Sequence, residues 1–95
     1  MIIGACRLRL HLPGCASLKE KRSRIKPLLA RLPKEFNVSV AEVGLHDVWQ
    51  SAELALVTVV HADPGRVQAS LETMVRWVEL HAPDVEVVMA PIELR

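Results

Sequence analysis

Residues 2–12 alternate between two kinds of side chain, and this alternation constrains the fold more than any other feature of the sequence. One set is small or apolar throughout, whereas the other set includes Arg7, Arg9 and His11. Successive side chains of a β-strand point to opposite faces of its sheet. A strand with one apolar and one cationic face is typical of an antiparallel sheet that is covered on one side and open to water on the other.

A turn and a helix start signal follow this strand. Pro13-Gly14 ends the strand, because proline lacks an N–H group and glycine accepts turn geometry. Ser17 has the position of an N-cap residue, and its hydroxyl can accept a hydrogen bond from the first turn. Glu20, three residues further on, can reach back toward the start of the helix. The sequence therefore predicts a capped helix that begins directly after Ser17.

This predicted helix has an interrupted apolar stripe. The residues at helical spacing that we expect to face the core are Leu18, Ile25, Leu29 and Leu32. Lys21 and Arg22 flank the gap that the stripe leaves one turn into the helix. Pro27 predicts a bend or a division of the helix near Lys26. Pro33 predicts that the helix ends at Leu32.

The remaining sequence contains four further segments with a regular pattern. They are a strand at 36–43 whose alternation fails near Glu42, a strand at 52–61, a helix with Asp63 at its N-cap and Pro64 behind it, and a strand at 85–94. The failed alternation is consistent with a β-bulge. The strand at 52–61 is apolar on both faces, which is typical of a central strand or of a sheet face that meets another subunit. Pro91 favours an edge position for the last strand.

The predicted order of elements is β-α-β-β-α-β within one domain, residues 1–95. Two helices on one face of a four-stranded antiparallel sheet form the simplest arrangement that buries both helical stripes. We therefore predict an α+β fold of the ferredoxin-like kind, with the strands in the order 4-1-3-2. On that order the uncovered sheet face carries Arg7, Arg9, His11, Ala55, Val57 and Val59.

Positive charge is concentrated at the start of the chain, although the net charge is only +1. Residues 1–34 contain nine cations and one carboxylate, whereas residues 35–95 contain three cations and ten carboxylates. Such asymmetry is typical of a nucleic-acid surface, unless the two segments interleave in the fold and neutralise each other. The cations of the predicted helix are also spread around it. Both an anion-binding surface and a merely solvated helix agree with this layout.

Three strings of the sequence resemble a known family. LPGCASLKEKRSRIKPL, FNVSVAEV and DVWQSAELALV occur in family order and together resemble the YlxP-like proteins, the family of domain of unknown function 503, over essentially the whole chain. The resemblance implies a small bacterial cytoplasmic protein of ferredoxin-like fold with no established activity. Family genes often lie near those of a translation initiation factor and a ribosome-binding factor, which implies a role in translation or ribosome maturation. The family has no agreed catalytic residues, so none is carried over.

From the charge layout and this resemblance we expect a non-enzymatic accessory factor that contacts ribosomal RNA or a ribosomal particle. The residues expected to make this contact are Lys19, Lys21, Arg22, Arg24 and Lys26, with Arg7 and Arg9 adding charge. RNA-binding sheets of this architecture commonly stack bases on aromatic side chains. The chain has no Tyr, and its one Phe, Phe36, is expected in the core, so base stacking on the sheet is not expected.

The alternative is a homodimeric protein-interaction or structural module. It would use the open sheet face to form the dimer and the His46–Gln50 loop to recognise a protein. The expected interface residues are His11, Ala55, Val57, Val59 and Trp49. The His46-Asp47 pair in this loop has no nucleophile placed beside it by the sequence, so catalysis is not expected.

Neither a metal nor a cofactor is expected. The four histidines and two cysteines lack metal-ligand spacing, and no glycine-rich phosphate loop is present. Cys6 is expected in the core. The chain opens directly into a strand with no signal peptide, and its longest uncharged apolar run, 54–60, is far shorter than the ~20 residues of a membrane span. We therefore expect a cytoplasmic protein with reduced thiols and no membrane contact.

Overall fold

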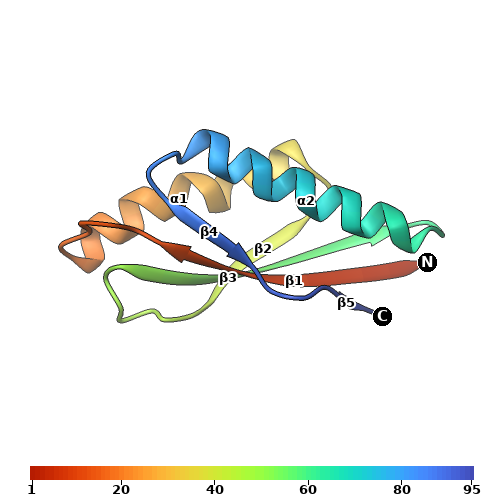
Figure 1. Cartoon of the computed structure of the whole chain (residues 1–95), viewed down its shortest axis with the longest axis horizontal. Coiled ribbons are helices and arrows are strands. Elements are labelled where there is room, and N and C mark those ends of the chain that lie inside the picture. The colour runs from red at the N-terminus through yellow and green to blue at the C-terminus, as the bar shows by residue number, and fades with distance from the viewer.

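The computed structural model describes residues 1–95 and has the predicted α+β, ferredoxin-like topology. Both helices lie on one face of an antiparallel sheet, and the other face is open (Figure 1). The strand order is β2-β3-β1-β4, which is the predicted order 4-1-3-2. The elements are β1 (Ile2–His11), α1 (Leu18–Glu35), β2 (Ser39–Gly44), β3 (Ser51–Val60), α2 (Pro64–His81), β4 (Glu86–Met89) and β5 (Glu93–Leu94).

The two central strands, β1 and β3, pair over their full lengths. Ile2 lies opposite Val60 at one end of the pairing, and His11 lies opposite Ser51 at the other. The alternation predicted for residues 2–12 is confirmed, since its apolar side is buried against the helices. On this side of the sheet, the fully buried leucines are Leu8 and Leu10 of β1 and Leu54 and Leu56 of β3. The arginines of β1 point to the opposite, open face.

The last predicted strand is divided in two. β4 pairs with the second half of β1, while β5 pairs with Gly4 and Ala5 near its start. Pro91 lies between the two segments and has no N–H group to donate to the sheet. The Ala90 N–H group still donates to the Arg7 carbonyl at 2.9 Å. The predicted edge position is therefore confirmed, whereas a continuous strand over 85–94 is wrong.

α1 is continuous through both of its prolines, so the expected end at Leu32 is wrong, and of the bend or division expected near Lys26 the division does not occur. The helix is not divided at Pro27, and it continues past Pro33 to Glu35. A proline inside a helix removes its own hydrogen bond to the preceding turn and crowds the carbonyl four residues earlier, but the other N–H groups of the helix can still donate. The Phe36 N–H group still donates to the Leu32 carbonyl at 2.9 Å, and the Leu32 side chain is fully buried. Packing of that side chain keeps the last turn helical.

The buried stripe of α1 differs from the predicted one. Its members are Lys21, Ile25, Leu28 and Leu32, which follow the spacing i, i+4, i+7 and i+11. Leu28 takes the place expected for Leu29, which is only half-buried. The gap in the apolar pattern is not a gap in the packing, because the Lys21 side chain occupies it.

The second half of the chain follows its predicted pattern closely. β2 begins at Ser39 rather than at Phe36, which caps α1, and the bulge near Glu42 is confirmed by a shift in pairing register. Asp63 caps α2 by accepting a hydrogen bond from the Gly65 N–H group at 2.9 Å. Neither helix combines the length and the apolar composition that crossing a membrane requires.

Candidate functional site

Lys21 is a buried structural residue and not an exposed cation. Its side chain is only 2% exposed. The ammonium donates hydrogen bonds to the carbonyl oxygens of Leu45 at 2.6 Å and Val48 at 2.9 Å. It also lies 3.2 Å from Oε2 of Glu42, an ion pair without hydrogen-bond geometry. The prediction that Lys21 contacts RNA is therefore wrong, because these oxygens surround its charge.

The Lys21 contacts fix the loop that joins β2 to β3. The Val48 N–H group closes a turn onto the Leu45 carbonyl at 3.0 Å, and Leu45 has a left-handed backbone with φ of 59°. At the far end of the loop, the Gln50 carbonyl accepts a hydrogen bond from the Leu12 N–H group at 2.8 Å. The backbone of the His46–Gln50 loop is thus held at both ends, while all five of its side chains are exposed. SLKEKR and FNVSVAEV, two of the strings that resemble the family, meet at the Lys21–Glu42 ion pair.

Arg24 is engaged in a contact between distant parts of the chain. Its Nη2 atom lies 2.9 Å from Oδ2 of Asp84, in the connection between α2 and β4. Its Nη1 atom donates to the Pro13 carbonyl at 3.4 Å. The Arg24 side chain is only 20% exposed, so its main role is to connect α1 to the segment before β4, and little of it is accessible to a partner.

Lys19, Arg22 and Lys26 remain as free cations on the first half of α1, and we call them the basic stripe. All three are exposed, and none has a carboxylate within 4.0 Å. At the ordinary helical rotation they fall within an arc of about 60°. Arg24 lies on the opposite side of the helix, toward Asp84. Because α1 packs over the edge strand β2, the basic stripe flanks that edge of the molecule.

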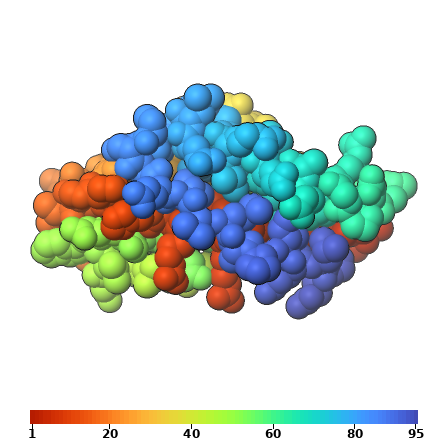
Figure 2. All heavy atoms as spheres, viewed as in Figure 1, coloured from red at the N-terminus to blue at the C-terminus, as the bar shows by residue number.

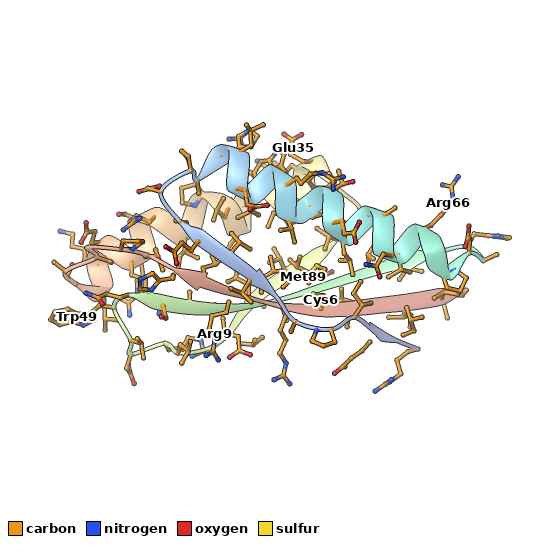
Figure 3. All side chains as sticks on the ribbon, in the orientation of Figure 1. Cys6, Arg9, Glu35, Trp49, Arg66 and Met89 are labelled. Atoms are coloured by element: carbon orange, nitrogen blue, oxygen red, sulfur yellow. The ribbon has the colours of Figure 1, made fainter.

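Arg7 and Arg9 lie on the open face of the sheet, away from the basic stripe. Figure 3 shows Arg9 projecting from the sheet on the side opposite the helices. Their side chains are 70% and 61% exposed, and both approach the Glu53 carboxylate, at 3.6 and 3.7 Å. The seven cations predicted to act together therefore belong to separate places. One is buried, one is paired with Asp84, three form the basic stripe and two share a carboxylate on the sheet.

The open face also carries a set of apolar side chains. Val57 and Val59 are 38% and 45% exposed, Ala55 is half-buried, and His11 is exposed at the end of β1. Val88 of β4 lies opposite Arg9 and is 66% exposed. Val88 was missing from the predicted interface. The alternation of residues 85–89 indicated its orientation, because Val85 and Val87 face the helices.

The Cys6 thiol belongs to the core, as predicted. It is 3% exposed and donates to the Ala90 carbonyl at 3.3 Å. Burial raises the pKa of the Cys6 thiol above its ordinary value of 9.0. Cys15 is also buried and unpaired, so neither thiol is presented at the surface. No three side chains of His, Cys, Asp or Glu gather where they could hold a metal ion.

Comparison with known proteins agrees with the resemblance carried by the three strings. Residues 3–91 match the family described as "Protein of unknown function (DUF503)". The chain belongs to this family. It is similar to the uncharacterized protein YlxP of Bacillus subtilis (strain 168), with 35% identity over 71 residues that span 75% of this chain and 74% of YlxP.

A solved structure shares the fold without close sequence similarity. It is a protein from an uncultured marine organism, described as a dimeric ferredoxin-like protein. The similarity covers 100% of this chain and 96% of that chain, with a TM-score of 0.52 and 9% sequence identity. At this identity the likeness confirms the ferredoxin-like fold and nothing further.

Proposed function

We propose that this protein is a non-enzymatic accessory factor that binds RNA, as the free chain or within a ribosomal particle, through the basic stripe. The single observation that carries the proposal is the arrangement of Lys19, Arg22 and Lys26. These cations are exposed, share one side of α1 and have no carboxylate partner. Three such charges at the spacing of helical turns fit the repeating phosphates of a nucleic-acid strand.

The contact makes a quantitative prediction about salt. Each neutralised phosphate releases counterions, so log K falls with log salt concentration by about 0.7–0.9 per contact. Three contacts predict a slope of about −2 to −3. Binding to ribosomal RNA, measured by filter retention or fluorescence anisotropy over a series of salt concentrations, gives this slope directly.

Charge reversal tests whether the basic stripe is the contact. The double variant Arg22→Glu/Lys26→Glu should lose most RNA affinity at low salt and flatten the remaining salt dependence. A matched control is Arg66→Glu/Arg76→Glu, which changes the net charge equally on exposed positions of α2. Equal loss in both double variants, or no RNA binding by the wild-type protein at low salt, would overturn the proposal. Lys21 is unsuitable for this test, because its ammonium is buried and bonded to the β2–β3 loop.

A homodimer through the open sheet face is a second candidate. The observation that favours it is the exposure of Val57, Val59 and Val88 beside the charges of Arg7, Arg9 and Glu53. A face that carries both charge signs can pair with its own copy around a two-fold axis. The structural neighbour described as dimeric shares this fold. The two candidate functions use different faces and are compatible.

Sedimentation measures the dimer. We expect a dimer at micromolar concentration that Val57→Lys converts to monomer. Burying the lysine ammonium in an apolar contact without a partner costs free energy. Leu80→Lys is the control, since Leu80 is 76% exposed on α2 and lies away from the sheet. A strictly monomeric wild-type protein would remove this second candidate.

A further inference from the structure

Trp49 is an exposed aromatic side chain on a fixed backbone. It is 52% exposed, whereas its loop is held by the Lys21 ammonium on one side and by the Leu12–Gln50 hydrogen bond on the other. A large ring presented in this way loses little conformational freedom when a flat partner binds to it. The neighbouring hollow is shallow and is lined by residues 47–50, so the ring is open to such a partner.

The second tryptophan of the chain, Trp77, contacts other aromatic and cationic side chains of the fold. Trp77 meets Phe36 edge-on at 6.2 Å and stacks on His81 at 4.2 Å. The Arg31 guanidinium lies 5.1 Å from the Trp77 ring. Trp49 takes part in no aromatic pair and no cation–π contact within the chain. Its face is therefore available.

Trp49 lies at the same end of the molecule as the first turns of α1. Figure 3 shows the ring projecting outward at this end, below the start of the helix. Figure 2 shows the β2–β3 loop and the start of α1 forming one continuous surface there. Lys21 joins the two segments directly through its bonds to the loop carbonyls. The basic stripe begins on these same turns, with Lys19 and Arg22.

We infer that this end of the protein binds an unpaired stretch of RNA, with one base stacked on Trp49 and the adjoining phosphates on Lys19 and Arg22. The inference rests on the proposed function and narrows it to single-stranded RNA. Proteins that bind single strands combine a cationic track with aromatic rings on which bases stack. Asp47 beside the ring repels phosphate, which places the base, and not the backbone, over the loop.

The experiment compares two substitutions that separate stacking from apolar contact. Trp49→Leu keeps an apolar side chain without a stacking face, and it should weaken binding of a short single-stranded RNA about tenfold. Trp49→Phe keeps the stacking face and should stay within about threefold of the wild type. Neither substitution removes a phosphate contact, so the salt slope should be unchanged in both variants. The same RNA annealed to its complement should bind more weakly and be insensitive to Trp49→Leu.

Tryptophan fluorescence gives an independent readout. In Trp77→Phe the only tryptophan is Trp49, and the single-stranded RNA should quench its emission with the affinity found in the binding experiment. In Trp49→Phe the only tryptophan is Trp77, and its emission should not respond. Together these variants locate the stacked base on one ring.

The outcomes separate this inference from the proposed function. Wild-type affinity of Trp49→Leu for the single strand, together with lost binding in Arg22→Glu/Lys26→Glu, would overturn the inference and leave the proposed function standing. Loss of a protein complex or of the dimer in Trp49→Leu, with RNA binding intact, would make the loop a protein contact and also overturn it. A wild-type protein that binds no RNA at low salt would overturn the proposed function itself.

Discussion

The two helices are built on one plan and differ at its first position. Each has 18 residues and buries four of them at the spacing i, i+4, i+7 and i+11. In α2 the first buried residue is Val67, which packs directly onto Gly4 of β1. In α1 the first buried residue is Lys21, which binds oxygens of Glu42 and of the β2–β3 loop.

The difference shows that helical periodicity defines a buried position without defining its chemistry. Val67 fits because Gly4 has no Cβ atom to oppose it. Lys21 fits because its ammonium meets two carbonyls and a carboxylate, which offset the cost of removing the charge from water. The two anchors also have different consequences. Val67 only attaches a helix to the sheet, whereas Lys21 also fixes the loop that presents Trp49.

Lys21→Met gives the largest expected effect on this comparison. It makes α1 resemble α2 at the first buried position, but leaves the Glu42 carboxylate without its counter-charge and the Val48 carbonyl without its Lys21 donor, while the Leu45 carbonyl keeps only the Val48 N–H group. We expect the free energy of unfolding to fall by about 3 kcal/mol, since breaking one side of a buried ion pair is strongly destabilising. Urea denaturation followed by circular dichroism measures the change.

The double variant Lys21→Met/Glu42→Met is the matched control. It removes the uncompensated carboxylate and should recover part of the lost stability, with the remainder due to the loop carbonyls. A single variant as stable as the wild type would show that the charged anchor of α1 is dispensable. In that case the two helices would be equivalent in energy as well as in spacing.

Gly4→Ala is the corresponding change beneath α2 and has the next largest effect. The added Cβ atom would collide with Cγ1 of Val67, a β-branched side chain that has little rotamer freedom in a helix. We expect a loss of about 2 kcal/mol from overpacking, measured in the same urea experiment. In Gly4→Ala/Val67→Ala the collision is absent, so the two substitutions should be far from additive. Additive losses would show that the close approach does not anchor α2.

Much of the fold was predictable because its signals are local. The alternation of residues 2–12 predicts both the strand and its covered face, and the Asp63-Pro64 pair predicts the start of α2. Once four strands and two helices stand in order, few topologies bury both helical stripes. The division of the last strand at Pro91 and the passage of α1 through Pro33 were not predicted, because they depend on which backbone groups find partners in the folded chain.

The candidate site was predicted less well, because its signals are distant in the sequence. The partners of Lys21 lie 21 to 27 residues further along the chain, so the basic string around it gives no sign of its burial. Arg24 pairs with Asp84 across 60 residues. When Lys21 and Arg24 are included, the cations of the first half of α1 are spread around the helix. The basic stripe becomes visible only when both are assigned to the fold.

The helix caps give the smallest stability effects and the finest comparison of α1 with α2. Ser17 accepts a hydrogen bond from the Glu20 N–H group at 3.0 Å, and Asp63 accepts one from Gly65 at 2.9 Å. Ser17→Ala and Asp63→Ala should each lower the free energy of unfolding by about 1 kcal/mol. In stability alone, the two variants should be nearly indistinguishable.

Hydrogen exchange should separate them. The backbone N–H group of Lys21 donates to the Ser17 carbonyl at 3.1 Å. Fraying of the first turn of α1 therefore also loosens the Lys21 side chain, whose ammonium holds the β2–β3 loop. Ser17→Ala should therefore speed exchange of the Val48 amide, which closes the loop turn, more than the fall in global stability explains. Asp63→Ala should change exchange at the start of α2 and leave Val48 at the rate set by global stability. Equal exchange of the Val48 amide in both variants would mean that the loop is held by its own turn and not by α1. The position of Trp49 would then be fixed by the loop alone.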